Sequence, residues 1–270
     1  MLELDLCCPC AEPQLPVAYG NRALSALHTP RQNHILAALP REDYERLLPD
    51  LEAVPLPLGL TVFRAGEQEK YLYFLTAGIV SRIYVMQSGA SAEFAATRNE
   101  GVIGIASFLG GESMPNQSVV YSAGYAYRLG GGAVKSELRR NSPLAQLLLR
   151  YTFALATQTG QIAVCNRHHS LQQQLCRWLL ARMDRMPLSE LAITQDQIAD
   201  LLGVRRESVT EAAGALQHAG LIRYSRGRIA VLDRFRLEAR ACECYAVVKR
   251  EYDRLLPRAS APTRQAEVFA

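Results

Sequence analysis

The sequence lacks the features that define membrane proteins, secreted proteins and most enzymes. No segment reaches the roughly 18–20 unbroken apolar residues that a membrane helix needs. The start, MLELDLCCPCAEP, has neither the basic residues nor the long apolar run of a secretory signal. The motifs G-x-S-x-G and H-E-x-x-H and the P-loop are absent. We therefore expect a cytoplasmic protein that is not an enzyme.

Cysteine is present in an odd number, which argues against a disulfide framework in a chain expected to be cytosolic. The seven cysteines are Cys7, Cys8, Cys10, Cys165, Cys176, Cys242 and Cys244.

Lysine is scarce, and the positive charge is almost entirely arginine. Only Lys70, Lys135 and Lys249 are lysines among 30 basic residues. The net charge of +4 is also uneven, because residues 1–163 carry 13 basic and 14 acidic residues whereas residues 164–256 carry 15 and 11. Arginine makes forked contacts with phosphate and guanine. The C-terminal third is therefore the candidate for binding an anionic partner, although a solvated basic face would look the same.

Residue patterns divide the chain into five segments. Proline, cysteine and small residues at the start are typical of a mobile leader. Short alternating runs broken by glycine, between residues 54 and 129, are typical of many short strands in a sandwich or barrel. Helical patterns follow. The predicted segments are a leader (1–30), a strand-rich domain (31–137), a long helix (138–168), a C-terminal domain (169–256) and a disordered tail (257–270).

The run SPLAQLLLRYTFALATQTGQIAVCN predicts one long helix, with Ser142 as its N-cap and Pro143 at the first helical position. Mainly apolar residues recur along it at alternating spacings of four and three, which matches a coiled coil over three heptads. Packing on its own domain is the alternative, and other apolar residues on the helix allow both contacts. We predict dimerisation through a stripe formed by Leu144, Leu148, Tyr151, Leu155, Gln158, Ile162 and Cys165, with Gln158 as the polar residue that fixes the register.

The stretch ITQDQIADLLGVRRESVTEAAGALQHAGLI predicts two short helices joined by a tight turn at Gly203. Thr194 and Gln197 form a capping box at the start of the first helix. The second helix begins near Arg206 and ends at Gly220. The following LIRYSRGRIAVL predicts two strands joined at Arg226–Gly227, which form a wing.

This unit favours DNA as the partner, because a helix-turn-helix inserts the N-terminal end of its second helix into the major groove. An arginine at that end can bind guanine O6 and N7, and a glutamate can accept from cytosine N4. Arginines of the wing would contact the phosphate backbone. The predicted DNA-binding residues are Thr194, Arg205, Arg206, Glu207, Ser208, Glu211, Arg223, Arg226 and Arg228.

On these residues, the chain resembles the Crp/Fnr family of bacterial transcription regulators over about residues 31–240. The resemblance implies an α+β fold with an N-terminal jelly-roll-like β-roll as sensor domain, a long dimerisation helix and a C-terminal winged helix-turn-helix. It also implies a homodimer that binds palindromic DNA, with RNA polymerase as a further partner to consider. Arg206 and Glu207 match the Arg-Glu pair that opens the family's recognition helix. Glu211 stands where members often carry a second arginine, so the half-site is expected to differ and Arg205 to share the contact.

Members that bind cyclic nucleotides carry a glutamate and an Arg-Ser pair in the β-roll. Here Val102 stands in place of the glutamate, and Gln117 and Ser118 in place of Arg-Ser. Because a neutral amide cannot neutralise the cyclic phosphate, we expect no cyclic AMP binding. The alternative function is a receptor for a cyclic nucleotide or cyclic dinucleotide on the same fold.

No cofactor and no metal site is predicted. The motif CCPC is tighter than the spaced cysteines of iron–sulfur members, although a redox or zinc role for Cys7, Cys8 and Cys10 stays open. His168 and His169 lack a third ligand at helical spacing, so a hinge is expected there. Cys242 and Cys244 are expected on one amphipathic helix, about 234–256, where positions i and i+2 face different sides. A haem ligand arrangement is not evident either.

Overall fold

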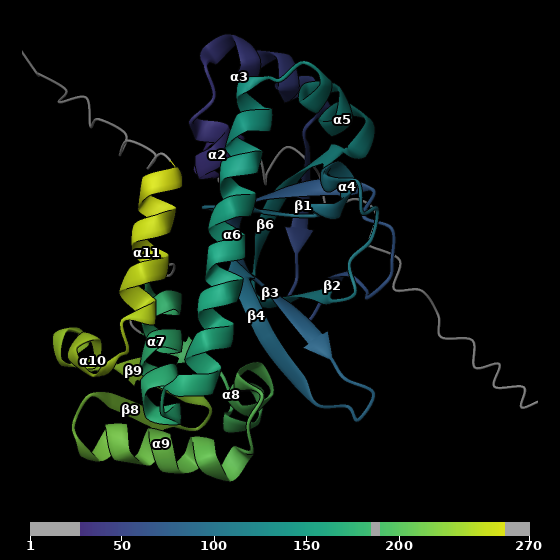
Figure 1. The fold of residues 1–270 in the computed structure, drawn as a ribbon. Coiled ribbons are helices and arrows are strands. Elements are labelled where there is room, and N and C mark those ends of the chain that lie inside the picture. Colours follow the sequence, from purple (N-terminus) through teal and green to yellow (C-terminus); the bar gives the residue numbers. More distant parts are fainter. Residues whose placement is uncertain (1–27, 185–189, 257–270) are drawn as a thin grey trace, which may run out of the picture.

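The computed structural model describes residues 28–184 and 190–256, and its elements are labelled in Figure 1. Residues 1–27 of the predicted leader (1–30) and the predicted tail, 257–270, lie outside the described residues. Short helices open the described chain: η1 (Pro30–Gln32), α2 (His34–Ala37), α3 (Arg41–Leu47) and η2 (Leu48–Asp50).

These helices pack on the β-roll through buried apolar side chains, and the buried side chain of Asn33 adds hydrogen bonds to that contact. The Asn33 side-chain oxygen caps α2 by accepting from the backbone N–H groups of Ile35 and Leu36. Its amide nitrogen donates to the backbone carbonyls of Leu75 and Gly101, both at 2.9 Å.

The β-roll is an antiparallel sheet with the strand order β1-β6-β3-β4, in which β2 pairs with β6 and β5 with β3. The pairing register of its two longest strands, β3 and β6, shifts where Gly78 and Gly124 approach each other. A Cβ on Gly124 would lie 2.1 Å from the Ala77 carbonyl oxygen, so only glycine fits there. The elements are β1 (Glu52–Leu56), β2 (Thr61–Phe63), β3 (Tyr71–Val85), β4 (Ser91–Thr97), β5 (Val102–Ile103), α4 (Ala106–Leu109) and β6 (Gln117–Gly130).

Three helices follow the β-roll in the chain: α5 (Gly131–Arg139), α6 (Pro143–His168) and α7 (Leu171–Met183). The predicted cap of the long helix is confirmed, since the Ser142 hydroxyl accepts from the backbone N–H of Ala145. Tyr151 anchors α6 to the sheet, because its hydroxyl lies 2.9 Å from Thr97 Oγ1 and donates to the Val102 carbonyl at 3.1 Å.

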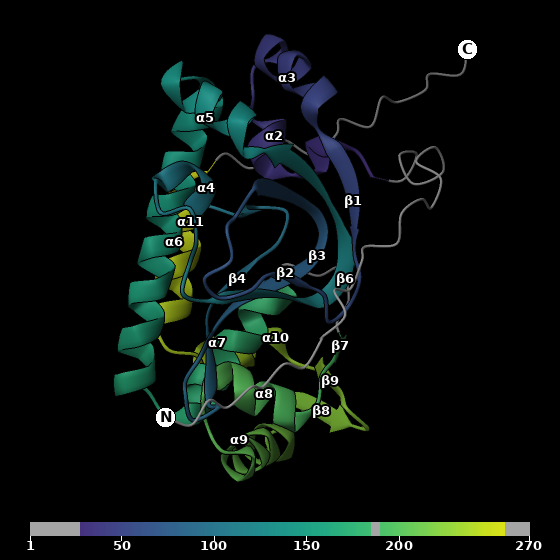
Figure 2. The ribbon, with the colours of Figure 1, turned by 90° about the vertical axis from the view of Figure 1, so that its right-hand side faces the viewer.

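The C-terminal domain lies at the lower end of α6 in Figure 1 and Figure 2. A small sheet of order β7-β9-β8 stands beside the helix pair α8 and α9. The last helix, α11, runs alongside α6. The elements are β7 (Glu190–Ala192), α8 (Gln195–Leu202), α9 (Arg206–His218), β8 (Ile222–Ser225), β9 (Arg228–Val231), α10 (Arg234–Arg240) and α11 (Cys244–Leu255).

The predicted dimer stripe is wrong. All seven of its residues are at most 8% exposed within a single chain, Gln158 and Ile162 included. The first four residues of the stripe, from Leu144 to Leu155, pack into the β-roll core. Gln158 accepts a hydrogen bond from the Tyr252 hydroxyl of α11 at 2.6 Å. The stripe is covered by the chain's own β-roll and last helix, so it is not available to a second copy.

The predicted single helix over about 234–256 is also wrong. The chain forms α10 and α11, separated at residues 241–243, where Ala241 has the extended angles φ −70° and ψ 155°. No helix among the described residues is long and apolar enough to cross a membrane.

Candidate nucleic-acid interface and a buried cysteine cluster

The second helix of the helix-turn-helix, α9, presents an uncapped and basic N-terminus. Gly203 ends α8 with φ +68°, as predicted for a left-handed cap. Arg205 is the N-cap of α9 and makes no side-chain cap hydrogen bond. The first backbone N–H groups of α9 are therefore free of a side-chain cap, and such groups bind anions.

The predicted contact residues lie where the sequence analysis expects them on this helix. Arg205, Arg206, Glu207 and Glu211 are exposed, and Ser208 is half-buried. Arg206 lies 3.5 Å from Asp196 of α8, and both side chains are more than 60% exposed. A pair this exposed is weak, so the Arg206 guanidinium can leave it for a partner.

The inner face of α9 holds this end in place. Val209, Ala212, Ala213 and Leu216 are buried, in agreement with the predicted apolar face. Side-chain contacts fix the two helices as well, since the Thr210 hydroxyl donates to Gln195 Oε1 of α8 at 2.7 Å.

At the start of α8, Thr194 and Gln197 form the predicted capping box. The backbone N–H of Gln197 donates to Thr194 Oγ1 at 3.2 Å, and the backbone N–H of Thr194 donates to Gln197 Oε1 at 2.9 Å.

The wing is a two-stranded hairpin whose turn has positive φ at Arg226 (49°) and Gly227 (71°). Positive φ at both central residues is the geometry of a tight type I′ turn. Arg223, Arg226 and Arg228 are exposed, so the hairpin carries unburied positive charge. Tyr224 ties the wing to the domain, because its hydroxyl donates to the Ile193 carbonyl at 3.0 Å.

The helix-turn-helix domain docks on the β-roll, a contact that sequence reasoning missed. The Arg182 side chain of α7 forms a buried ion pair with Glu93 of β4, with Nη2 2.6 Å from Oε2. Burial raises the pKa of Glu93, but the Arg182 charge and the hydrogen bonds from Arg182 and Ser81 outweigh it and leave this pKa below its ordinary value. The Ser91 hydroxyl of β4 also donates to the Asp200 carbonyl of α8 at 3.1 Å.

The predicted ligand positions lie inside the β-roll. Val102 and Ser118 are buried, and Gln117 is half-buried. Opposite Ser118 on β3 stands Arg82, which is also buried. Its Nη2 donates to the Val102 carbonyl at 2.7 Å, while its Nη1 has no hydrogen-bond partner among the described residues.

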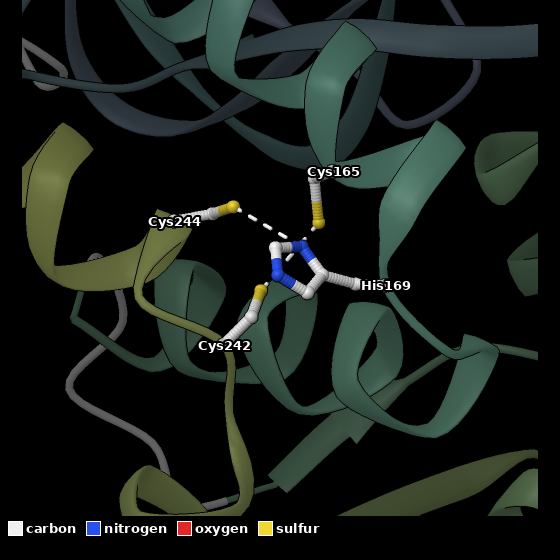
Figure 3. A group of neighbouring side chains, drawn as sticks. All are labelled: Cys165, His169, Cys242 and Cys244. Carbon is white, nitrogen blue, oxygen red and sulfur yellow. Dashed lines mark hydrogen bonds between the residues drawn. The ribbon is translucent and has the colours of Figure 1, made fainter.

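A cluster that the sequence analysis rejected is brought together where α6 ends. Cys165, His169, Cys242 and Cys244 turn their side chains toward one point, as Figure 3 shows. Their ligand atoms all lie within 4.8 Å of one another. Burial raises the pKa of Cys165, and that of Cys242 to about 12.

We expected these residues not to share one site, and that expectation was wrong for two local reasons. Cys165 precedes His169 by four residues, so it is the neighbour at helical spacing that the histidine pair was expected to lack. The break between α10 and α11 lets Cys242 and Cys244 face the same side, which a continuous helix would forbid. Cys7, Cys8 and Cys10 lie outside the described residues.

The geometry defines a class of protein in which a long helix joins a winged helix-turn-helix to a β-roll. Comparisons with known proteins agree. The Crp-like helix-turn-helix domain model matches residues 173–240. The global nitrogen regulator of Nostoc sp. is 25% identical over 180 residues, which are 63% of this chain and 81% of that protein.

Two solved structures share the fold. FixK2 from Bradyrhizobium japonicum has a TM-score of 0.63 at 16% identity, covering 71% of this chain and 98% of that one. A Crp/Fnr-family regulator from Eubacterium rectale has a TM-score of 0.64 at 17% identity, covering 78% and 98%.

Together, the domain match, the relatives and the shared fold confirm the resemblance and the fold class. Residues 173–240 match a Crp-like helix-turn-helix DNA-binding domain, and the chain is similar in sequence and in fold to transcription regulators of the Crp/Fnr type. The related proteins are regulators and not enzymes, which confirms the expectation that this protein is not an enzyme.

Proposed function

We propose that the protein acts as a homodimer on palindromic operators in the bacterial cytoplasm, with RNA polymerase as a further partner. The observation that carries the proposal is the uncapped N-terminus of α9, where Arg205, Arg206 and Glu207 are exposed above a buried inner face. Each copy would place this end in a major groove.

The roles of the interface residues follow from their chemistry. Arg206 would bind guanine, with Arg205 beside it, and Glu207 would accept from cytosine N4. Ser208 and Thr194 would contact the edge of the groove and the backbone. The wing residues Arg223, Arg226 and Arg228 would contact phosphates and set the position of the domain without reading bases. Glu211, exposed on the next turn, would repel phosphate and disfavour half-sites that place the backbone there.

Homodimerisation is supported by a face of α6 that the single chain leaves open. Leu149 and Phe153 are 53% and 58% exposed although both are large and apolar. Exposed residues continue the same stripe at spacings of three and four, the coiled-coil spacing. Small residues in its lower half would let two helices approach closely. The stripe, called the open α6 face below, is Gln146, Leu149, Phe153, Ala156, Gly160, Ala163 and Arg167.

The test is selection of binding sites from a random DNA duplex library, followed by affinity measurements on the selected operator. We expect enrichment of a palindrome. Replacing Arg206 by alanine should weaken binding by about 1–3 kcal/mol and relax the preference at one base of each half-site. Arg41→Ala is the control, because Arg41 is an exposed arginine of α3 that lies far from α9 in the sequence. This change should leave the DNA affinity unchanged. Failure to enrich any motif would refute sequence-specific binding.

A second candidate, a receptor for an anionic second messenger, is favoured by one observation. The Arg82 guanidinium is buried in the β-roll with one nitrogen unpaired among the described residues, next to Val102 and opposite Ser118. An arginine there would supply the positive charge that Gln117 lacks. Calorimetry of the full chain with cyclic AMP, cyclic GMP and cyclic di-GMP tests this candidate. Binding of none of the three, or binding that Arg82→Gln leaves intact in a folded protein, rejects it.

A further inference from the structure

We propose that Cys165, His169, Cys242 and Cys244 form a Cys₃His site for a single Zn²⁺ ion or another soft divalent cation. Cys165 lies in the last turn of α6, and His169 is the C-cap that follows the last helical residue. Cys242 lies in the turn after α10, and Cys244 is the first residue of α11. Four donors therefore meet from two distant segments of the chain (Figure 3).

The spacing of the donors fits one ion. Structural zinc is tetrahedral, with Zn–S near 2.3 Å and Zn–N near 2.0–2.1 Å. Those bonds place two sulfurs about 3.8 Å apart and a sulfur and a nitrogen about 3.5 Å apart. Here Cys165 Sγ lies 3.5 Å from Cys242 Sγ, and Cys244 Sγ lies 3.5 Å from His169 Nδ1. An iron–sulfur cluster would place iron and sulfide between its ligands and so needs wider spacing.

The surroundings of the donors support a bound cation. The second ring nitrogen of His169 lies 3.3 Å from the Glu243 carboxylate, the carboxylate–histidine arrangement that orients metal ligands. Gln161 Nε2 donates to Cys244 Sγ at 3.1 Å, as it would to a thiolate.

The net charge of the cluster and its access from solvent also fit a bound cation. Three thiolates and one Zn²⁺ leave one net negative charge. Arg177, 8% exposed with its Nε unpaired among the described residues, supplies a positive charge that acts on Cys165. Cys244 lies in the wall of a cleft of about 460 Å³ between α6, α7 and α11, which gives an ion a route of entry.

The consequence of this site is mechanical. An ion would join the end of α6 to the turn between α10 and α11, next to the start of α7 at Leu171. It would fix the position of the helix-turn-helix domain against the long helix. This inference rests on the ligand cluster alone and does not need the proposed operator binding.

The experiment uses the full chain with Cys7, Cys8 and Cys10 replaced by serine, so that these cysteines cannot contribute ligands. After treatment with chelator and reductant, the protein is titrated with Co²⁺ and then with Zn²⁺. We expect one ion per chain, a thiolate-to-cobalt charge-transfer band and the intense d–d bands of tetrahedral Co²⁺, all displaced by Zn²⁺. Zn²⁺ should also raise the melting temperature, because it binds only the folded state.

Variants separate the site from its neighbours. Cys165→Ser, Cys242→Ser, Cys244→Ser and His169→Gln should abolish the cobalt spectrum and the Zn²⁺-dependent rise in melting temperature. Glu243→Gln, an exposed change that should leave folding intact, should weaken Zn²⁺ binding about 10–100-fold. The matched controls Cys176→Ser and His168→Gln, a buried cysteine and a neighbouring histidine outside the cluster, should leave the spectrum unchanged.

Four results would overturn the proposal. They are no binding, an octahedral cobalt spectrum, iron with inorganic sulfide in the protein as purified, and binding that survives the cluster substitutions. A Cys165–Cys242 disulfide that forms in preference to metal binding, detected by mass spectrometry without reductant, would identify the cluster as a redox pair instead.

Discussion

Glu93 and Arg182 show how a single residue pair can hold two domains together. The pair is buried at the contact between β4 and α7, and Arg182 also stacks on the Trp178 ring at 3.8 Å. Replacing Glu93 by glutamine leaves the Arg182 charge buried without its partner. We expect this change to lower the free energy of unfolding by about 3–5 kcal/mol, measured by urea denaturation. Glu52→Gln, which breaks the more exposed pair with Arg128, is the control and should cost less than about 1 kcal/mol.

The same pair predicts a pH dependence. Because the pKa of Glu93 is lower in the folded protein than in the unfolded chain, its contribution is complete above the ordinary glutamate pKa of 4.5. That contribution is lost as the pH falls below 4.5 toward the folded-state pKa. Unfolding curves of the parent and the Glu93→Gln variant should therefore converge in this acidic range, and a constant difference between them would contradict the assignment.

Gly101 shows a packing constraint at one backbone position. A Cβ added there would lie 2.2 Å from the Tyr151 ring, whose hydroxyl is held by Thr97 and Val102. Gly101→Ala should lower the free energy of unfolding by about 1–3 kcal/mol, because the ring has to move. Gly214→Ala is the matched control. Its Cβ would enter open space on α9, and alanine should stabilise that helix by about 0.5–1 kcal/mol. Equal effects of the two changes would show that Tyr151 is not tightly held.

At the scale of an element, the open α6 face makes a prediction about assembly. Phe153→Glu places a charge on the exposed stripe without touching the buried side of the helix. If two copies meet there, light scattering should show the variant as a monomer at concentrations where the parent is a dimer. Leu58→Glu, at an exposed apolar position between β1 and β2, is the control and should keep the dimer. A dimer that survives Phe153→Glu would place the interface elsewhere.

How far the sequence predicts an element depends on how local its signals are. The cap at Thr194, the glycine turn at Gly203 and the buried face of α9 are neighbours in sequence, so they predicted the helix-turn-helix correctly. The length and N-cap of α6 were also predicted from such local signals. Its dimer stripe was not predicted correctly, because two stripes with the same 3-4 spacing run along this helix. Only tertiary packing shows that one of them is covered by the β-roll and α11.

The cysteine cluster could not be predicted from the sequence, for a related reason. Its donors come from two segments, and the turn at residues 241–243 carries no glycine or proline to mark the end of α10. The pair Cys165 and His169 was the one signal available in the sequence, four residues apart. The docking of Arg182 on Glu93 depends on a contact between domains, and residue patterns within one segment do not predict such contacts.

At the scale of the whole molecule, the concentration of arginine in the C-terminal third predicts a strong effect of salt on DNA affinity. The logarithm of the association constant should fall linearly with the logarithm of the salt concentration. Arg223→Gln, on the exposed side of β8, should reduce the slope by about one while leaving the selected sequence unchanged. Arg41→Ala should change neither quantity. A slope that Arg223→Gln leaves unaltered would remove this residue from the phosphate contacts.

The unbroken course of α6 sets a mechanical condition on the operator. Its 26 residues make a rod about 39 Å long, held by Tyr151 in its upper part and followed directly by α7. A tilt of about 5° at the β-roll end would displace the far end by roughly 3 Å, close to the rise of one base pair. In a symmetric pair of such rods both far ends would move, so the distance between the two helix-turn-helix domains would change by up to roughly 6 Å, or about two base pairs. The number of base pairs that separates the half-sites could then report which tilt the regulator has adopted.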